Sequence, residues 1–119
     1  MDKPGNKIRR DKMNGQKYCI VMSTFESEEQ ADKIIDQVIF MRLAACVQSL
    51  PIQSKYFWEG KVQKDTEVLV FFKTKSDLYE ELKTLLMEIH PYDTPEIIKT
   101  DIADGSEGYL NWINEVTKK

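Results

Sequence analysis

The chain has 119 residues, of which 41% are hydrophobic and 31% charged, and its net charge at pH 7 is −3. This length and composition describe one globular domain and exclude two independent cores and wholesale disorder. No apolar run exceeds five residues, as in Leu43–Val47, whereas a membrane-spanning helix needs about 20, and the N-terminus has no secretory-signal pattern. We therefore expect a cytosolic protein whose two cysteines are reduced.

The charge is unevenly distributed along the chain. Residues 1–16 hold five lysines and arginines against two aspartates, so they carry +3 and residues 17–119 carry −6. An acidic body repels phosphate backbones, and the basic run is short and poor in aromatic residues, so we expect no nucleic-acid partner. We predict a flexible basic leader over 1–16 and one folded domain over 17–119.

The domain begins with a strand pattern and then a helix pattern. Segment 17–24 is rich in Tyr, Ile and Val, which predicts a strand in the centre of a sheet. Ser27 with Gln30 resembles a capping box, and the apolar residues that follow at helical spacing predict an amphipathic helix over about 27–43.

A long hairpin is predicted next. Segment 45–53 has a strand pattern that contains Pro51. Because proline cannot donate to a ladder, this strand belongs at an edge or a bulge, and we expect it to bend there and resume over 55–58. The short turn 59–61 leads into a second long strand over 62–75.

The last elements are a helix, a strand and a helix. Ser76 or Asp77 is expected to cap the second helix, which stops at His90 because Pro91 follows. A short strand is predicted over 96–102, and Gly105 precedes a final helix. That helix begins at Ser106 and has these residues facing inward: Tyr109, Leu110, Trp112, Ile113 and Val116. The order β-α-β-β-α-β-α predicts an α+β, ferredoxin-like βαββαβ fold with an antiparallel sheet and an additional C-terminal helix.

The third predicted strand is apolar on both faces. Val68, Val70 and Phe72 occupy even positions, and Leu69 and Phe71 occupy odd ones. Such a pattern is typical of a strand buried on both sides. The two crossover helices cover one face of the sheet, so we expect a second subunit to cover the other and predict an obligate homo-oligomer.

His90 is the only histidine, and it opens the cluster of special residues His90–Glu96. The negative end of the helix dipole favours the charged form of the His90 imidazole. A helix-stop loop is the favoured interpretation, because one histidine without a second histidine or a nearby cysteine is a poor metal site. A functional role would need partners from elsewhere in the fold or from a neighbouring subunit, and Cys46 and Glu67 are the candidates.

A ligand cleft is the second candidate site. Glu67 and Lys73 occupy odd-numbered positions of the same predicted strand, so their side chains lie on the same face. We expect them to be solvated or paired with other charges, or to line a cleft if that face is a subunit interface. Cys46 follows two alanines and is more often a small hydrophobe than a reactive thiol. Aromatic residues such as Tyr92 would line the same cleft or pack in the core. The chain has no glycine-rich phosphate loop, acid–base histidine pair or nucleophile elbow, so we expect no enzymatic activity.

Several ordered motifs between about Lys17 and Val116 together resemble the CutA divalent-cation tolerance family. The motifs are Arg42-Leu43-Ala44-Ala45-Cys46-Val47, Pro51, Tyr56-Phe57-Trp58-Glu59-Gly60-Lys61, Glu67-Val68, Lys73-Thr74, His90-Pro91-Tyr92, Pro95-Glu96 and Tyr109-Leu110-x-Trp112. The resemblance implies a homotrimer similar in architecture to the PII signal proteins, with long hairpins that clasp neighbouring subunits.

The resemblance also implies a role in tolerance of copper and other divalent metals. Some bacterial members have a cysteine and a second histidine at the positions of Ser23 and Ile89, so this chain keeps only His90 of that set. The two replacements remove soft ligands that select Cu(I) and weaken a Cu(II) site. The resemblance therefore implies weak binding of Cu2+ or Zn2+ through His90.

Three functional hypotheses follow. The leading one is a trimeric CutA-like tolerance protein that binds divalent cations weakly near His90. The second is a PII-like module that binds an anionic or polar metabolite in clefts lined by Cys46, Glu67, Lys73, His90 and Tyr92. The third is a scaffold without a ligand.

Overall fold

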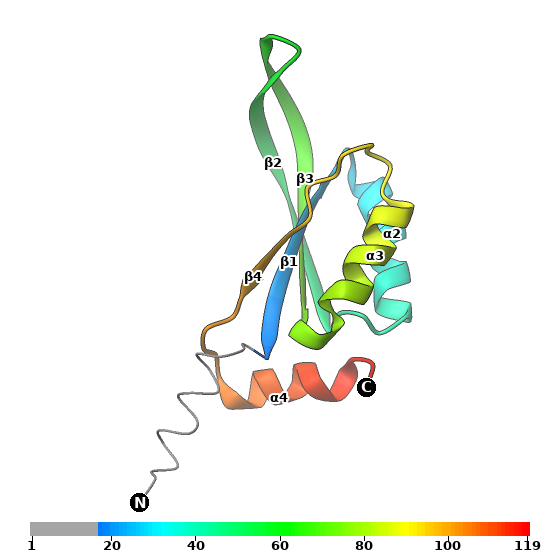
Figure 1. Ribbon diagram of the computed structural model, residues 1–119, viewed down its shortest axis with the longest axis vertical. Coiled ribbons are helices and arrows are strands. Elements are labelled where there is room, and N and C mark those ends of the chain that lie inside the picture. Colours follow the sequence, from blue (N-terminus) through cyan, green and yellow to red (C-terminus); the bar gives the residue numbers. More distant parts are fainter. Residues whose placement is uncertain (1–16) are drawn as a thin grey trace, which may run out of the picture.

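The computed structural model describes residues 17–119 and confirms the predicted α+β fold and order of elements. The elements are β1 (Tyr18–Phe25), α2 (Glu28–Phe40), β2 (Cys46–Trp58), β3 (Lys61–Lys75), α3 (Tyr79–Ile89), β4 (Ile98–Asp101) and α4 (Glu107–Val116). The strands form one antiparallel sheet in the order β2-β3-β1-β4 (Figure 1). The predicted leader over 1–16 lies outside the described residues. None of the helices within 17–119 is long and apolar enough to cross a membrane.

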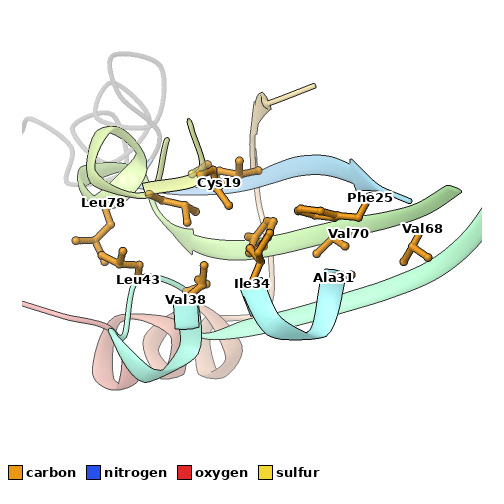
Figure 2. Close-up of a cluster of buried hydrophobic side chains, with 14 residues drawn as sticks. Cys19, Phe25, Ala31, Ile34, Val38, Leu43, Val68, Val70 and Leu78 are labelled. Atoms are coloured by element: carbon orange, nitrogen blue, oxygen red, sulfur yellow. The ribbon is translucent and has the colours of Figure 1, made fainter. Parts of the chain in front are cut away.

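The hydrophobic core lies between one face of the sheet and the two crossover helices. Figure 1 shows α2 and α3 on the same side of the sheet, and Figure 2 shows Ile34 and Val38 of α2 beside the strands. Alternate residues of β1 and β3 point into this layer, as period-2 strands require. The buried sheet residues are Cys19, Val21, Phe25, Val68, Val70 and Phe72.

The opposite face of the sheet is apolar but not covered. Met22 of β1 is the register partner of Phe71 in β3 and of Ile98 in β4, while Leu50 of β2 pairs with Leu69 of β3. None of these five side chains is fully buried, and Leu50 and Ile98 are plainly exposed. The prediction that the two crossover helices cover one face is confirmed. α4 reaches the other face at the Lys73 end of β3, where Tyr109 packs over Lys73, and a cover for the Met22–Phe71 region would have to come from outside the described chain.

The β2–β3 hairpin projects beyond the helices (Figure 1). Glu59 and Gly60 form its turn with φ angles of 51° and 76°, a left-handed pair typical of the type I′ turns that suit strand twist. Pro51 pairs with Val68 in an uninterrupted register that runs to Trp58. The expected edge position is correct, because β2 is an outer strand. The expected break in the strand is wrong, since an edge proline can direct its missing donor to solvent.

Several element boundaries differ from the predictions. The first crossover helix ends at Phe40 rather than 43, because Arg42 adopts a positive φ of 59° and the chain turns there. Neither Ser76 nor Asp77 caps the second helix. Both lie in a 3-10 turn over Ser76–Leu78, and the cap residue Leu78 makes no side-chain cap bond. The fourth strand spans four residues, Ile98–Asp101, rather than the predicted seven.

The C-terminal helix is less buried than its pattern suggested. Ile113 is fully buried, whereas Tyr109 and Trp112 are each 39% exposed. Their rings pack against each other with centroids 5.6 Å apart. The C-terminal end of α4 is fixed to the segment after α2, where Arg42 Nε donates to the Val116 carbonyl at 3.0 Å.

Candidate functional site

His90 lies where α3 ends and Pro91 begins the next segment. The ring is 8% exposed and stacks on Phe25 of β1, with centroids 4.5 Å apart and planes 16° from parallel. Its backbone N–H still closes the last helical turn on the Leu86 carbonyl. The end of α3 thus places the imidazole against Phe25, at the C-terminal end of β1.

Both ring nitrogens of His90 are used by the chain itself. Nε2 lies 3.0 Å from the Thr24 carbonyl, which can only accept, so Nε2 carries the proton. Nδ1 then accepts from the backbone N–H of Tyr92 at 3.1 Å. Burial lowers the pKa of His90 and outweighs the raising effects of the Thr24 carbonyl and Glu67. The side chain is a neutral imidazole without a free lone pair, rather than the charged form expected from the helix dipole.

Ser23 is in direct contact with His90. Its Oγ lies 3.1 Å from Nε2, and both side chains are buried. Ser23 is the position at which the resemblance implied a cysteine in some family members, so the fold brings these two matched positions together although they are 67 residues apart in the sequence. The Thr24 carbonyl is the partner that sequence reasoning missed, because a backbone acceptor has no residue-type signal.

Tyr92 links His90 to the hairpin. Its ring is 4.9 Å from the imidazole, and its hydroxyl donates to Glu67 Oε2 at 2.9 Å. Burial is the main cause that raises the pKa of Tyr92, and the Glu67 carboxylate adds to it. Glu67, one of the two candidate partners of His90, is therefore joined to it through Tyr92.

A cleft of about 720 Å3 opens beside Tyr92, between the hairpin and the loop after α3. Among residues 17–119, five carboxylates, three aromatic rings and three threonines line it, and none of the lining residues is a lysine or arginine. The lining residues are Thr24, Glu26, Tyr56, Trp58, Asp65, Thr66, Glu67, Tyr92, Asp93, Thr94 and Glu96. We call this the acidic cleft. Its charge favours a cation over the anionic metabolite considered above.

The other two predicted cleft residues lie elsewhere. Cys46 and Lys73 are register partners near the opposite end of β3, and six residues of strand separate Lys73 from Glu67, about 20 Å. The Lys73 ammonium sits 5.6 Å from the ring centroid of Tyr109, and Tyr109 also hydrogen-bonds Cys46, which contributes to the raised pKa of the phenol after burial. Within one chain, the five predicted residues therefore form two clusters rather than one cleft.

The donor atoms of the site suit a weakly held cation. Within residues 17–119, no three His, Cys, Asp or Glu side chains are close enough together to hold a metal ion. Carboxylate oxygens are hard ligands, and the one imidazole must give up its bond to Tyr92 N–H before it can ligate. A cation bound by a single chain would keep most of its water.

The family profile described as "CutA1 divalent ion tolerance protein" matches residues 19–116, nearly the whole of the described fold. The chain belongs to the CutA1 family. A relative named "Divalent-cation tolerance protein CutA" from Pyrococcus horikoshii is 45% identical over 100 residues, covering 84% of this chain and 98% of the relative. A protein of the same name from Yersinia pestis is 40% identical over 96 residues, covering 80% and 81%.

Solved CutA1 structures have the same fold. The crystal structure of Pyrococcus horikoshii CutA1 superposes with a TM-score of 0.82 at 44% identity, covering 85% of this chain and 99% of that one. Oryza sativa CutA1 gives 0.84 at 36% identity, with 87% and 96% covered. A protein from Archaeoglobus fulgidus, described as a periplasmic divalent cation tolerance protein, gives 0.82 at 34% identity, with 85% and 99% covered. The CutA resemblance seen in the motifs is confirmed.

Proposed function

We propose that this CutA1 family member is a non-catalytic homotrimer that contributes to divalent-cation tolerance by binding cations such as Cu2+ or Zn2+ weakly beside His90. The single observation that carries the cation-binding part is the acidic cleft. Within the part of the chain that the structure describes, five carboxylates and no basic side chain line it, and the names of the relatives refer to divalent cations.

The uncovered sheet face supports the homotrimer. Met22, Leu69 and Phe71 form an apolar surface on the side of the sheet away from α2 and α3. Exposed apolar area costs about 25 cal/mol per Å2, so a second layer over this face would contribute several kcal/mol. Sedimentation equilibrium at low micromolar concentration should give about three times 13.9 kDa. A monomer would contradict the trimer.

Calorimetric titration with Cu2+ and with Zn2+ tests the cation site. We expect weak, saturable binding to the wild-type protein. Glu67→Gln should reduce it, because the variant removes the charge but keeps an acceptor for Tyr92. His90→Ala tests the imidazole separately. Loss in His90→Ala supports ligation by the ring, loss in Glu67→Gln alone supports a carboxylate site, and no heat with the wild-type protein contradicts cation binding.

The ligand-binding module stays as the second candidate, because Tyr56, Trp58 and Tyr92 border the acidic cleft and aromatic faces attract organic cations. A titration with amines and with organic anions separates these ligand classes, and the absence of any ligand would leave the scaffold hypothesis. We also retain the cytosolic location as a proposal, which the unpaired thiols of Cys19 and Cys46 support. Fractionation of cells that produce the tagged protein tests that location.

A further inference from the structure

The outer half of the hairpin carries an uncompensated pair of lysines. Lys55 and Lys64 are register partners, and their parity places them on the same side of the ribbon as Val68 and Val70, the side that faces α2 and α3 further down. Because the hairpin extends past both helices (Figure 1), both lysines are exposed. Within residues 17–119, neither forms an ion pair.

This arrangement opposes the stability of the isolated hairpin. Like charges directly opposite each other destabilise a strand pair, and a projecting two-stranded ribbon is marginal in water. Next to the lysines, Phe57 is 72% and Val62 is 64% exposed, again as a register pair. The Lys55–Lys64 and Phe57–Val62 pairs therefore form a surface that suits a partner with carboxylates and apolar side chains.

The acidic cleft offers matching negative charge. Asp65 and Glu67 accept tyrosine hydroxyls, whereas Glu26, Asp93 and Glu96 are exposed and form no ion pair in the described part of the chain. These three carboxylates come from the end of β1 and from the loop after α3. One protomer therefore presents a positive surface and a negative surface at the same end of the molecule.

The two surfaces cannot satisfy each other within one chain, because they belong to different sides of the hairpin. Tyr56, Asp65 and Glu67 border the cleft from one face of the ribbon, and Lys55 and Lys64 lie on the other face. A ring-shaped homo-oligomer uses two different, complementary surfaces on every subunit. Opposite charges on opposite faces of one projecting element meet this requirement.

We infer that the lysine pair Lys55–Lys64 of one protomer docks against Glu26, Asp93 and Glu96 of the next protomer. The inference rests on the proposed homotrimer and deepens it. Each acidic cleft is then completed by two ammonium groups from a neighbour, which fix the register of the ring. The half-buried part of the cleft around Glu67 and Tyr92 stays available to a small cation.

Charge reversal tests the docking. In the full chain, Lys55→Glu with Lys64→Glu brings two further carboxylates to the five that already line each cleft. We expect the concentration at which half of the trimer dissociates to rise by about tenfold or more. The wild-type trimer should also dissociate more readily at high salt, since exposed charge pairs are screened. A matched control, Lys17→Glu with Lys33→Glu, makes the same change in net charge at two exposed lysines away from the hairpin and should leave dissociation unchanged.

Compensating substitutions identify the partner. Adding Asp93→Lys and Glu96→Lys to the hairpin double variant should restore the wild-type dissociation concentration, while these two changes alone should weaken the trimer. Far-UV circular dichroism checks that every variant is folded. A wild-type monomer would overturn the homotrimer itself. A wild-type trimer that the hairpin variant does not weaken, or that the compensating changes do not restore, would overturn the lysine docking and leave the homotrimer standing.

Discussion

At the scale of single residues, the main feature of the site is that hydrogen bonds within the chain occupy both ring nitrogens of His90. Thr24 and Tyr92 use the two ring nitrogens of His90, and Ser23 stands where a soft ligand would complete the set. A serine hydroxyl is a poor ligand for copper, whereas a thiolate is a good one. The engagement of both ring nitrogens is a second reason, beside ligand identity, to expect metal binding at His90 to be weak.

Ser23→Cys tests this reasoning. The side chain already lies 3.1 Å from His90 Nε2 and is buried, so a thiol should fit with a small change in volume. We expect copper affinity to rise on the order of tenfold or more, because a thiolate replaces a hydroxyl beside the imidazole. Competition titration with a copper chelator measures the change. Thr117→Cys, a buried hydroxyl position directly after α4, is the control, and equal affinity in both variants would contradict a site at His90.

The lowered pKa of His90 predicts how stability depends on pH. Burial disfavours the charged ring, so the folded state binds its proton less tightly than the unfolded chain, whose pKa is near 6.5. The contribution is fully present above about pH 6.5 and decreases as the pH falls through the folded pKa. Denaturation curves between pH 7.5 and about 5 should show this loss. His90→Gln, which does not titrate, should have a flatter profile, and parallel profiles would refute the assignment.

At the scale of elements, the β2–β3 hairpin depends on a two-residue turn in which Gly60 suits the required positive φ and Glu59 does not. Glu59 and Gly60 both have positive φ, and a non-glycine residue in this region pays about 1–2 kcal/mol. Nothing lies within 4 Å of a Cβ added at Gly60, so space is not limiting and the backbone angle alone decides. The projecting part of the hairpin has no helix beside it, so the backbone strain of the turn has its largest effect on stability there.

Matched substitutions in the turn test that argument. Gly60→Ala should lower the free energy of unfolding by about 1 kcal/mol, and Glu59→Asn should raise it by a few tenths, because Asn-Gly suits the type I′ turn. Guanidinium denaturation at one protein concentration measures both. Gly108→Ala, in α4 where nothing crowds the new Cβ, should instead stabilise the protein. A neutral effect of Gly60→Ala would show that the turn is adaptable.

At the scale of the whole molecule, the sheet has one face in the core and one face without a partner. The uncovered face predicts that assembly, rather than a second layer of the same chain, completes the fold. Phe71 lies between Met22 and Gln48 in the register, near the centre of this face. Placing a charge there would leave the core between the sheet and α2 intact and would disturb only what covers the other side.

Phe71→Glu therefore tests assembly. We expect the trimer to dissociate to a species of 13.9 kDa, because an unpaired carboxylate is costly to bury at an apolar interface. Sedimentation equilibrium measures the mass. Phe40→Glu is the control, since Phe40 is 87% exposed on α2, away from the open face, and the variant should assemble as the wild type does. Identical behaviour of both variants would show that the open face is not the interface.

The fold and the family could be predicted from local patterns in the sequence. Short runs rich in β-branched and aromatic residues predict β1 and β3, and Pro91 fixes the end of α3. These signals are local, because they depend on side-chain period and backbone chemistry along a few residues. The same local signals misplaced the end of α2 and the cap of α3, where a left-handed Arg42 and a 3-10 turn reflect packing against distant segments.

The contacts within the candidate site result from tertiary packing. Sequence parity placed Glu67 and Lys73 on one face, but strand length separates them, and Tyr92 rather than Lys73 became the partner of Glu67. The engagement of His90 by the Thr24 carbonyl involves a backbone atom 66 residues away. Such contacts depend on how strands and helices pack together in space, and for that reason no pattern along the chain predicts them.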